Sequence, residues 1–299
     1  MIILIPEKKE IHQSAIELLI KHGVKIVHSY DKKNFIDIEG LFIRTYTQAN
    51  KKYINQFPNL KYILRAGVGL DNIDLEECNK RNIKVINAPG SNSNSVAEYV
   101  IGVMIMLSRN FLKQNGLLYK HEWRERKYMG EELTNKVIGL VGCGAIGRIV
   151  ASKLKSFGIR EILGYDPYLN KEFLAKFNVK KLSLDEVIKN SDIISLHLPL
   201  TKETTNLFDD EKISMMKKNA YIINTSRGGI IKEKSLIKAL QKNLIKGAAL
   251  DVFESEPNIN PQLLNCYNLV LTPHIAGFTK EADKNMSVAP VLKFIEMIK

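Results

Sequence analysis

The sequence predicts an α/β protein built from two doubly wound parallel sheets, with one domain inserted into the other. Two observations support this prediction. Short apolar runs alternate with amphipathic stretches along the chain, and the alternation starts afresh at Lys136. The 299 residues suffice for two domains of ordinary size, and the 45% hydrophobic content is that of a globular protein.

The N-terminal third is expected to form five strands with helices between them. Ile11–Lys21 and Asp74–Lys80 fit helices. The polar stretch Pro89–Asn94 then caps a long helix that begins near Ser95 and runs past Arg109. The predicted strands are Ile2–Ile5, Lys25–His28, Gly40–Ile43, Tyr62–Leu64 and Lys84–Ile86.

A second series of six strands follows, and this number matches a complete dinucleotide-binding sheet. The last residues, from about Thr279 to Lys299, are expected to form a helix that packs back on the first domain. We therefore assign residues 1–94 and 278–299 to one domain and residues 95–277 to the inserted one, with a ligand cleft between them. The six predicted strands are Val137–Val141, Glu161–Tyr165, Asp192–Leu196, Ala220–Ile223, Gly247–Leu250 and Leu269–Leu271.

Composition narrows the class of protein. Cys78, Cys143 and Cys266 lie far apart without a C-x-x-C pattern, which argues against disulfides and zinc and for a reducing compartment. Met1–Ile5 is too short for a signal peptide, and the apolar run Tyr99–Leu107 is only half a membrane span. The net charge is +12, but the lysines are scattered and no nucleic-acid motif accompanies them. We expect a cytoplasmic protein that binds neither nucleic acid, nor membranes, nor a metal.

The hexapeptide Gly142–Gly147 has the G-x-G-x-x-G pattern of a dinucleotide cradle. An apolar strand precedes it and a helix-compatible stretch follows, which is the context that the motif requires. Gly142, Gly144 and Gly147 allow a tight turn and let backbone amides approach a pyrophosphate. Asp166 lies 24 residues after Gly142, where a carboxylate binds both ribose hydroxyls of NAD and repels the 2′-phosphate of NADP. The sequence therefore predicts NAD as the cofactor.

Arg227 and His274 are candidate catalytic residues. Each follows a predicted strand, so each lies at the edge of the sheet where ligands bind in open α/β folds. A guanidinium can hold a carboxylate through two parallel hydrogen bonds, and an imidazole titrates near neutral pH and can exchange a proton. Glu254 and Glu256 are equal candidates for the carboxylate that orients the imidazole. This set predicts proton and hydride transfer on a 2-hydroxy acid.

With these motifs, the chain resembles the D-2-hydroxyacid dehydrogenase family over essentially its whole length. The resemblance implies a Rossmann NAD-binding domain inserted into a flavodoxin-like substrate-binding domain. It also implies an oxidoreductase that interconverts a D-2-hydroxy acid and its 2-oxo acid. The segments that carry the resemblance are Arg65–Asp74, Gly142–Gly147, Arg227–Gly229, Ala248–Phe253 with Glu256 and Pro257, and Thr272–Gly277.

The resemblance assigns a role to each matching position. The family's catalytic residues fall on Arg227, Glu256 and His274, which decides the choice of carboxylate against Glu254. A threonine common in the branch of the family that oxidises 3-phosphoglycerate is Ala88 here, so any side-chain contact at that position is absent. The substrate carboxylate typically meets backbone amides of Gly67, Val68 and Gly69. Besides the three glycines of the cradle, the cofactor contacts fall on Ala145, Ile146, Asp166, Leu198, Thr225, Ser226, Asp251, Ala276 and Gly277.

Further sequence segments resemble the branch of this family that oxidises 3-phosphoglycerate, which is the first step of serine biosynthesis by the phosphorylated pathway. The implied substrate is a phosphorylated hydroxy acid. Arg65, Arg126 and Lys127 are candidates for its phosphate, the last two by reaching across a homodimer; the alternative for each is an ordinary surface charge. The sequence segments that carry this second resemblance are Trp123, Arg126–Gly130 with Glu132 and Leu133, Gly164–Pro167, and Thr279–Ala282.

Two other functions remain open. The first is a glyoxylate/hydroxypyruvate or D-lactate reductase, which would not prefer the phosphorylated substrate. The second is an NADH-sensing corepressor, because the C-terminal binding proteins have a similar fold. Many members of the phosphoglycerate branch continue into a regulatory domain that binds serine; this sequence ends at Lys299, and we expect no such module.

Overall fold

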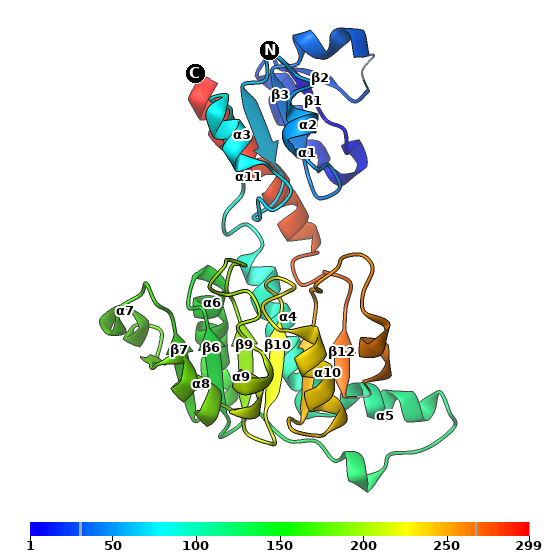
Figure 1. Cartoon of the computed structure of the whole chain (residues 1–299), viewed down its shortest axis with the longest axis vertical. Coiled ribbons are helices and arrows are strands. Elements are labelled where there is room, and N and C mark those ends of the chain that lie inside the picture. The colour runs from blue at the N-terminus through cyan, green and yellow to red at the C-terminus, as the bar shows by residue number, and fades with distance from the viewer. Residues whose placement is uncertain (30–31, 267, 299) are drawn as a thin grey trace. The chain divides into compact units, whose positions relative to one another are not determined.

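The computed structural model describes residues 1–29, 32–266 and 268–298, so the expected helix end at Lys299 lies outside the described residues. The chain divides into two compact units. Unit 1 comprises Met1–Asn92 and Phe278–Lys299, and unit 2 comprises Ser93–Gly277 (Figure 1). The first division falls at the start of a helix at Ser93, two residues before the expected boundary.

Unit 1 contains a five-stranded sheet with the order β2-β1-β3-β4-β5, in which every pair of neighbours is parallel. This order is that of a flavodoxin-like sheet. Buried side chains fill both faces, with Phe42 and Phe294 in one cluster and Leu41 and Phe57 in the other. The strands are β1 Ile2–Leu4, β2 Lys25–Val27, β3 Gly40–Ile43, β4 Tyr62–Arg65 and β5 Lys84–Ile86, and the helices are α1 Gln13–Lys21, α2 Lys51–Ile54, α3 Leu75–Lys80 and α11 Lys280–Ile298.

Unit 2 contains a seven-stranded parallel sheet with the order β12-β11-β10-β9-β6-β7-β8. Counted from β6, this is the Rossmann order 3-2-1-4-5-6 with one more strand added. The strands are β6 Val137–Val141, β7 Glu161–Tyr165, β8 Val179–Lys181, β9 Ile193–Leu196, β10 Tyr221–Asn224, β11 Gly247–Leu250 and β12 Leu269–Leu271.

Helices cover both faces of this second sheet, with α4 behind it and α10 in front of it in Figure 1. Because both faces are buried, the central strands read as continuous apolar runs rather than as alternating ones. The helices are α4 Ser93–Ser108, α5 Phe111–Leu118, α6 Ala145–Leu154, α7 Lys171–Ala175, α8 Leu184–Asn190, α9 Asp210–Ser214 and α10 Glu233–Gln241. The prediction of two doubly wound parallel sheets is thus confirmed.

Two elements differ from the prediction. The strand β8 was not expected, because it is a three-residue edge strand in which only Val179 is apolar and buried. The long helix was expected to continue past Arg109, but α4 ends at Ser108. Asn110 then takes a left-handed φ of 48° and precedes α5, so the sequence contains a break that its apolar pattern hides.

Among the described residues, no single helix is long and apolar enough to cross a membrane. The helices α4 and α5 meet the length and composition criteria only when taken together, and they are bent by 65° relative to each other. Most of the apolar run in α4 is buried in the core of unit 2, where Val100, Val103 and Met104 are at most 3% exposed.

Candidate active site

Most of the predicted site residues of unit 2 converge at one edge of its sheet. Gly142 follows β6, Asp166 follows β7, Leu198 lies two residues after β9, Thr225 follows β10 and Asp251 follows β11. Because every pair of neighbouring strands is parallel, these residues lie together at the carboxyl edge. The strand order reverses between β6 and β9, which is the place where doubly wound sheets bind ligands.

Each of the three glycines in the G-x-G-x-x-G loop is required for a different structural reason. Gly142 has a φ of +94°, and a Cβ there would lie 2.4 Å from the carbonyl oxygen of His197. A Cβ at Gly147 would lie 2.5 Å from the carbonyl oxygen of Gly142. Gly144, by contrast, has nothing within 4 Å of its missing Cβ and directly precedes α6. The backbone at Gly144 therefore leaves space for a phosphate group to approach a helix N-terminus.

Asp166 links the cradle to the loop that follows β7. Its Oδ2 accepts a hydrogen bond from the Cys143 N–H at 2.9 Å, and its Oδ1 accepts from the N–H groups of Tyr168 and Leu169 at 2.9 and 3.1 Å. The side chain is largely buried, at 8% exposure. Asp166 thus lies at the predicted ribose position and also joins the glycine loop to the loop after β7. The second, structural role was not expected from the sequence.

The remaining predicted cofactor contacts support a fit to NAD. Leu198 lies beside Gly142, because its Cδ2 is 3.1 Å from a Cβ built there. The Thr225 hydroxyl is buried without a hydrogen-bond partner among the described residues, so it can still bind a ligand. The Ser226 hydroxyl, however, donates to the Leu196 carbonyl at 2.5 Å and fixes the loop itself. Ala145 and Ile146 form the first turn of α6.

Asp251 holds the turn that carries His274. Its two carboxylate oxygens accept the N–H groups of Ile275 and Ala276, both at 2.8 Å, and its carbonyl accepts the His274 N–H at 2.9 Å. Asp251 is only 1% exposed. The turn therefore has a fixed position at the end of β12, and Gly277 closes unit 2 directly after it.

His274 and Glu256 form a hydrogen-bonded pair. The His274 Nδ1 lies 2.8 Å from Glu256 Oε2, while Glu256 Oε1 accepts the Phe253 N–H at 3.0 Å. The bond to Glu256 raises the pKa of His274, and the charges of Glu256 and Asp251 add to this, against burial and the charge of Arg227. Burial acts to raise the pKa of Glu256, but the bonds from His274 and Phe253 and the charges of His274 and Arg227 lower it overall. The imidazolium form is thus stabilised while the carboxylate stays ionised.

Glu254 lies elsewhere. Its carboxylate accepts the Glu233 N–H at the start of α10, and Glu233 accepts the Glu254 N–H in return, both at 2.8 Å. Burial raises the pKa of Glu233, and the charge of Glu254 adds to the rise. The geometry therefore pairs the imidazole with Glu256 and not with Glu254, the alternative that motif spacing alone had left open.

The loop of Arg227 packs directly against the loop of Glu256. A Cβ at Gly228 would lie 1.7 Å from the Phe253 carbonyl oxygen, so only glycine fits between the two loops. The Arg227 guanidinium donates to the Ser226 carbonyl at 2.7 Å, and its charge acts on the pKa of both Glu256 and His274. The structure thus brings a cation, a carboxylate and an imidazole together at one edge of the sheet.

One histidine beside the glycine loop, His197, was not singled out by the sequence analysis. Both ring nitrogens of His197 are buried and have no hydrogen-bond partner among the described residues. Burial lowers the pKa of His197 to about 4, so its imidazole is neutral at physiological pH. Its position directly after β9, at the reversal of strand order, is the signal that could have identified it.

In unit 1, the predicted substrate residues lie at the carboxyl end of β4. The Arg65 guanidinium donates to the Ala66 carbonyl at 2.7 Å and covers Gly67, whose Cβ would lie 1.9 Å from it. The Asn87 side chain donates to the Val68 carbonyl at 2.7 Å and fixes the loop that continues to Gly69. Arg44, which sequence reasoning did not consider, follows β3 at the same edge; its side chain is buried and forms an ion pair with the partly exposed Asp283 of α11.

Arg126 and Lys127 lie at the opposite edge of the second sheet. Glu131, a few residues further on, binds Lys246 just before β11, and Tyr128 accepts a hydrogen bond from Gln114 of α5. Lys127 pairs with Glu125 at 2.6 Å. Within one chain, the structure therefore does not bring Arg126 and Lys127 together with Arg227 and His274.

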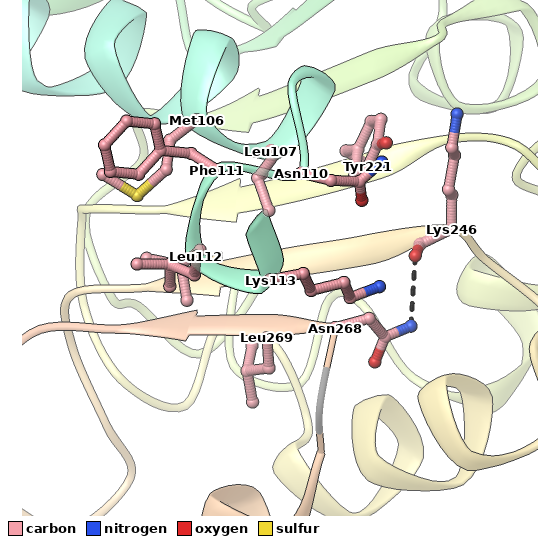
Figure 2. A pocket seen from close by; sticks show the side chains of 11 residues that line it. Met106, Leu107, Asn110, Phe111, Leu112, Lys113, Tyr221, Lys246, Asn268 and Leu269 are labelled. Atoms are coloured by element: carbon pink, nitrogen blue, oxygen red, sulfur yellow. Dashed lines mark hydrogen bonds between the residues drawn. The ribbon is translucent and has the colours of Figure 1, made fainter. Parts of the chain in front are cut away.

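A pocket lies at this amino edge as well, between the end of α4, the start of α5 and the ends of three strands (Figure 2). Lys113, Tyr221, Lys246 and Asn268 provide its polar groups. Burial lowers the pKa of Lys113, and the charge of Lys246 adds to this effect. The pocket is separate from the candidate catalytic groups, which lie at the other end of the strands.

Comparison with known proteins identifies the family. Residues 101–276 match the model of the D-isomer specific 2-hydroxyacid dehydrogenase, NAD binding domain. A D-3-phosphoglycerate dehydrogenase of Methanocaldococcus jannaschii is 40% identical over 280 residues, which are 92% of this chain and 53% of that protein. The chain thus spans about half the length of the curated relatives it matches.

Solved structures show the same fold along the whole chain. A glyoxylate reductase from Paecilomyes thermophila superposes with a TM-score of 0.90 at 26% identity, covering 100% of this chain and 95% of that one. A D-lactate dehydrogenase from Aquifex aeolicus in complex with NAD and lactic acid gives 0.83 at 27% identity, covering 100% and 94%. The chain therefore belongs to the D-isomer specific 2-hydroxyacid dehydrogenase family, and the second sheet with its helices is the family's NAD-binding domain.

Proposed function

We propose that this protein is an NAD-dependent dehydrogenase that interconverts 3-phosphoglycerate and 3-phosphohydroxypyruvate. The observation that carries the general reaction is the His274–Glu256 pair beside Arg227 at the carboxyl edge of the NAD-binding domain. The specific substrate is supported by curated relatives named D-3-phosphoglycerate dehydrogenase at 36–40% identity.

In this proposal His274 is the acid/base. Because its Nδ1 is bonded to Glu256, the imidazole exchanges a proton through Nε2. In the direction of reduction, the imidazolium delivers that proton to the C2 oxygen of the 2-oxo acid. In the direction of oxidation, the neutral Nε2 accepts the proton of the C2 hydroxyl. When bound, the nicotinamide supplies or accepts the hydride at C2.

Arg227 binds the substrate carboxylate and polarises the C2 oxygen, because a guanidinium presents two parallel donors to a planar acceptor. Glu256 keeps the imidazole oriented and stabilises its charged form. Gly142, Gly144 and Gly147, with Asp166, hold the cofactor. Arg65 and the amides of Gly67, Val68 and Gly69 are proposed substrate contacts on the strength of the family resemblance.

A homodimer is part of the proposal. Several large apolar side chains of α5 and the segment after it are strongly exposed, and their grouping in one segment favours an interaction surface there. In this proposal a second copy of the chain covers them, and Arg126 and Lys127, which belong to the same segment, contact the substrate of that neighbour. The exposed side chains are Phe111, Leu118, Tyr119, Trp123 and Met129.

The test is a substrate comparison that follows NADH absorbance. The purified chain is assayed with 3-phosphohydroxypyruvate, hydroxypyruvate, glyoxylate and pyruvate at matched concentrations. We expect kcat/KM for the phosphorylated substrate to exceed the others by about tenfold or more, because an ion-paired phosphate adds at least one charge-assisted contact. A preference for glyoxylate or pyruvate would instead assign the reductase function that two structural neighbours carry.

A further inference from the structure

Two hydroxyl groups connect the catalytic turn to the longest helix of unit 2. The Thr272 Oγ1 donates to Asp251 Oδ1 at 2.6 Å, and the Tyr99 hydroxyl lies 2.5 Å from the same Thr272 oxygen. Tyr99 belongs to α4, whose apolar face is buried in the core. A chain of hydrogen bonds therefore runs from α4 through Thr272 to the carboxylate that holds the turn of His274.

The direction of each hydrogen bond follows from the donors available. An ionised carboxylate only accepts, so Thr272 must donate its single proton to Asp251. The Thr272 oxygen can then only accept, so Tyr99 is the donor. Burial raises the pKa of Tyr99, and the charge of Asp251 adds to the rise against the hydrogen bond with Thr272. The phenol is therefore protonated at neutral pH and can fill this role.

The turn needs such support because its backbone is strained. His274 has a φ of +55°, a left-handed conformation that non-glycine residues adopt at an energetic cost. Asp251 offsets this by accepting three N–H groups of the turn, two on its side chain and one on its carbonyl. The hydrogen bond from Thr272 holds the Asp251 side chain in the orientation that these bonds require, and Tyr99 in turn holds the Thr272 hydroxyl.

We propose that Tyr99 and Thr272 are positioning residues for His274, acting through Asp251, an inference that rests on the proposed acid/base role of His274. Their side-chain hydrogen bonds are with each other and with Asp251, and not with the imidazole. Together they fix the turn so that Nδ1 of His274 stays on Glu256 and Nε2 stays directed away from it. The sequence motifs assign no role to either hydroxyl.

The charged groups that act on His274 are Glu256, Asp251 and Arg227. The largest influence that raises its pKa is the hydrogen bond to Glu256. A turn that is free to move lengthens this bond, and the pKa of His274 then falls. Reduction requires the protonated imidazole, so the alkaline limb of its pH profile moves to lower pH.

The experiment compares four variants of the full chain: Tyr99→Phe, Thr272→Val, Thr272→Ser and the double variant Tyr99→Phe with Thr272→Val. Thr272→Val should lower kcat for reduction by about fivefold, the worth of one hydrogen bond, and move the alkaline limb to lower pH. Thr272→Ser keeps the hydroxyl and should retain both the rate and the profile. Tyr99→Phe, which removes a single oxygen, should show a smaller loss in the same direction.

The double variant decides whether the two hydroxyls act as one chain. If Tyr99 acts only through Thr272, the double variant should be no worse than Thr272→Val alone. The inference would be overturned if the losses of kcat in the two single variants multiplied in the double variant. It would also be overturned if Thr272→Ser were as impaired as Thr272→Val, or if Thr272→Val kept the pH profile of the unmodified protein. Melting temperatures of all variants identify any that merely unfold, and Tyr99→Phe remains informative if the valine variant does.

His274→Ala separates this inference from the proposed function. If His274→Ala remains active, the acid/base assignment itself is wrong. If His274→Ala is inactive while Thr272→Val keeps the wild-type rate and pH profile, only the positioning chain is refuted.

Discussion

At the scale of single residues, the His274–Glu256 pair makes the most direct prediction. Glu256→Gln keeps a hydrogen-bonding side chain but removes the charge that stabilises the imidazolium. The pKa of His274 should fall, so kcat/KM for reduction should decline at lower pH than in the unmodified protein. His274→Ala should lower turnover by roughly a hundredfold or more while NADH binding persists.

Glu254→Gln is the matched control for this experiment. Its side-chain oxygen can still accept the Glu233 N–H, so the start of α10 is preserved, and Glu254 has no bond to the imidazole. Its pH profile should coincide with that of the unmodified protein. A profile shifted by Glu254→Gln but not by Glu256→Gln would show that the carboxylate is misassigned.

Asp166 makes a second residue-scale prediction, on cofactor choice. Asp166→Ala should reduce the affinity for NAD by about tenfold or more relative to NADP, because an acceptor for ribose hydroxyls and a charge that repels a 2′-phosphate disappear together. Lost bonds to Cys143, Tyr168 and Leu169 loosen the loop for both cofactors. The ratio of the two dissociation constants, measured by NAD(P)H fluorescence, is therefore the informative quantity; an equal loss for both would refute the assignment.

At the scale of elements, the buried strands could be predicted well because their burial on both faces gives continuous apolar runs, as in Val137–Val141. The edge strand β8 could not, because one buried valine followed by two lysines carries no such signal. The break between α4 and α5 depends on the backbone of Asn110, which hydrophobic periodicity does not report. Residues tied to motifs, such as His274, were found, whereas Tyr99 was not, because its partner Thr272 is distant in sequence.

The glycine cradle gives a prediction for an element. Gly142→Ala should lower the melting temperature, because a side chain at a φ of +94° meets the His197 carbonyl. Gly144→Ala should cost about 1 kcal/mol or less, because alanine is a poorer N-cap than glycine but nothing lies within 4 Å of the added methyl. Its NADH affinity should nevertheless fall by about tenfold, because the methyl occupies the space of the phosphate. Calorimetry and NADH titration of both variants separate the two effects; a Gly144→Ala protein that binds NADH normally would place the phosphate elsewhere.

At the scale of the whole molecule, the sheets of the two units differ in how much of the proposed site they supply. The NAD-binding domain carries the complete set of Arg227, Glu256 and His274 at one edge, together with the cradle. Arg126 and Lys127 lie at its other edge, beyond the reach of that set within the same chain. A phosphate contact by these residues therefore requires a second copy, which links substrate preference to assembly.

This link can be tested through the exposed apolar surface after α5. Trp123, which is 75% exposed, is replaced by Glu, and Ile20 on α1, which is 56% exposed, is replaced by Glu as a control. In sedimentation velocity, the unmodified protein and Ile20→Glu should be dimers, and Trp123→Glu should dissociate, because burying a charge in an apolar interface is unfavourable. The monomer should show a KM for 3-phosphohydroxypyruvate raised by about tenfold and an unchanged KM for unphosphorylated hydroxypyruvate, since only the phosphate loses contacts.

Arg126→Ala should reproduce that selective rise without dissociating the dimer. If Trp123→Glu stays dimeric, the interface lies elsewhere; if its monomer keeps the phosphate preference, Arg126 and Lys127 do not bind substrate across the dimer.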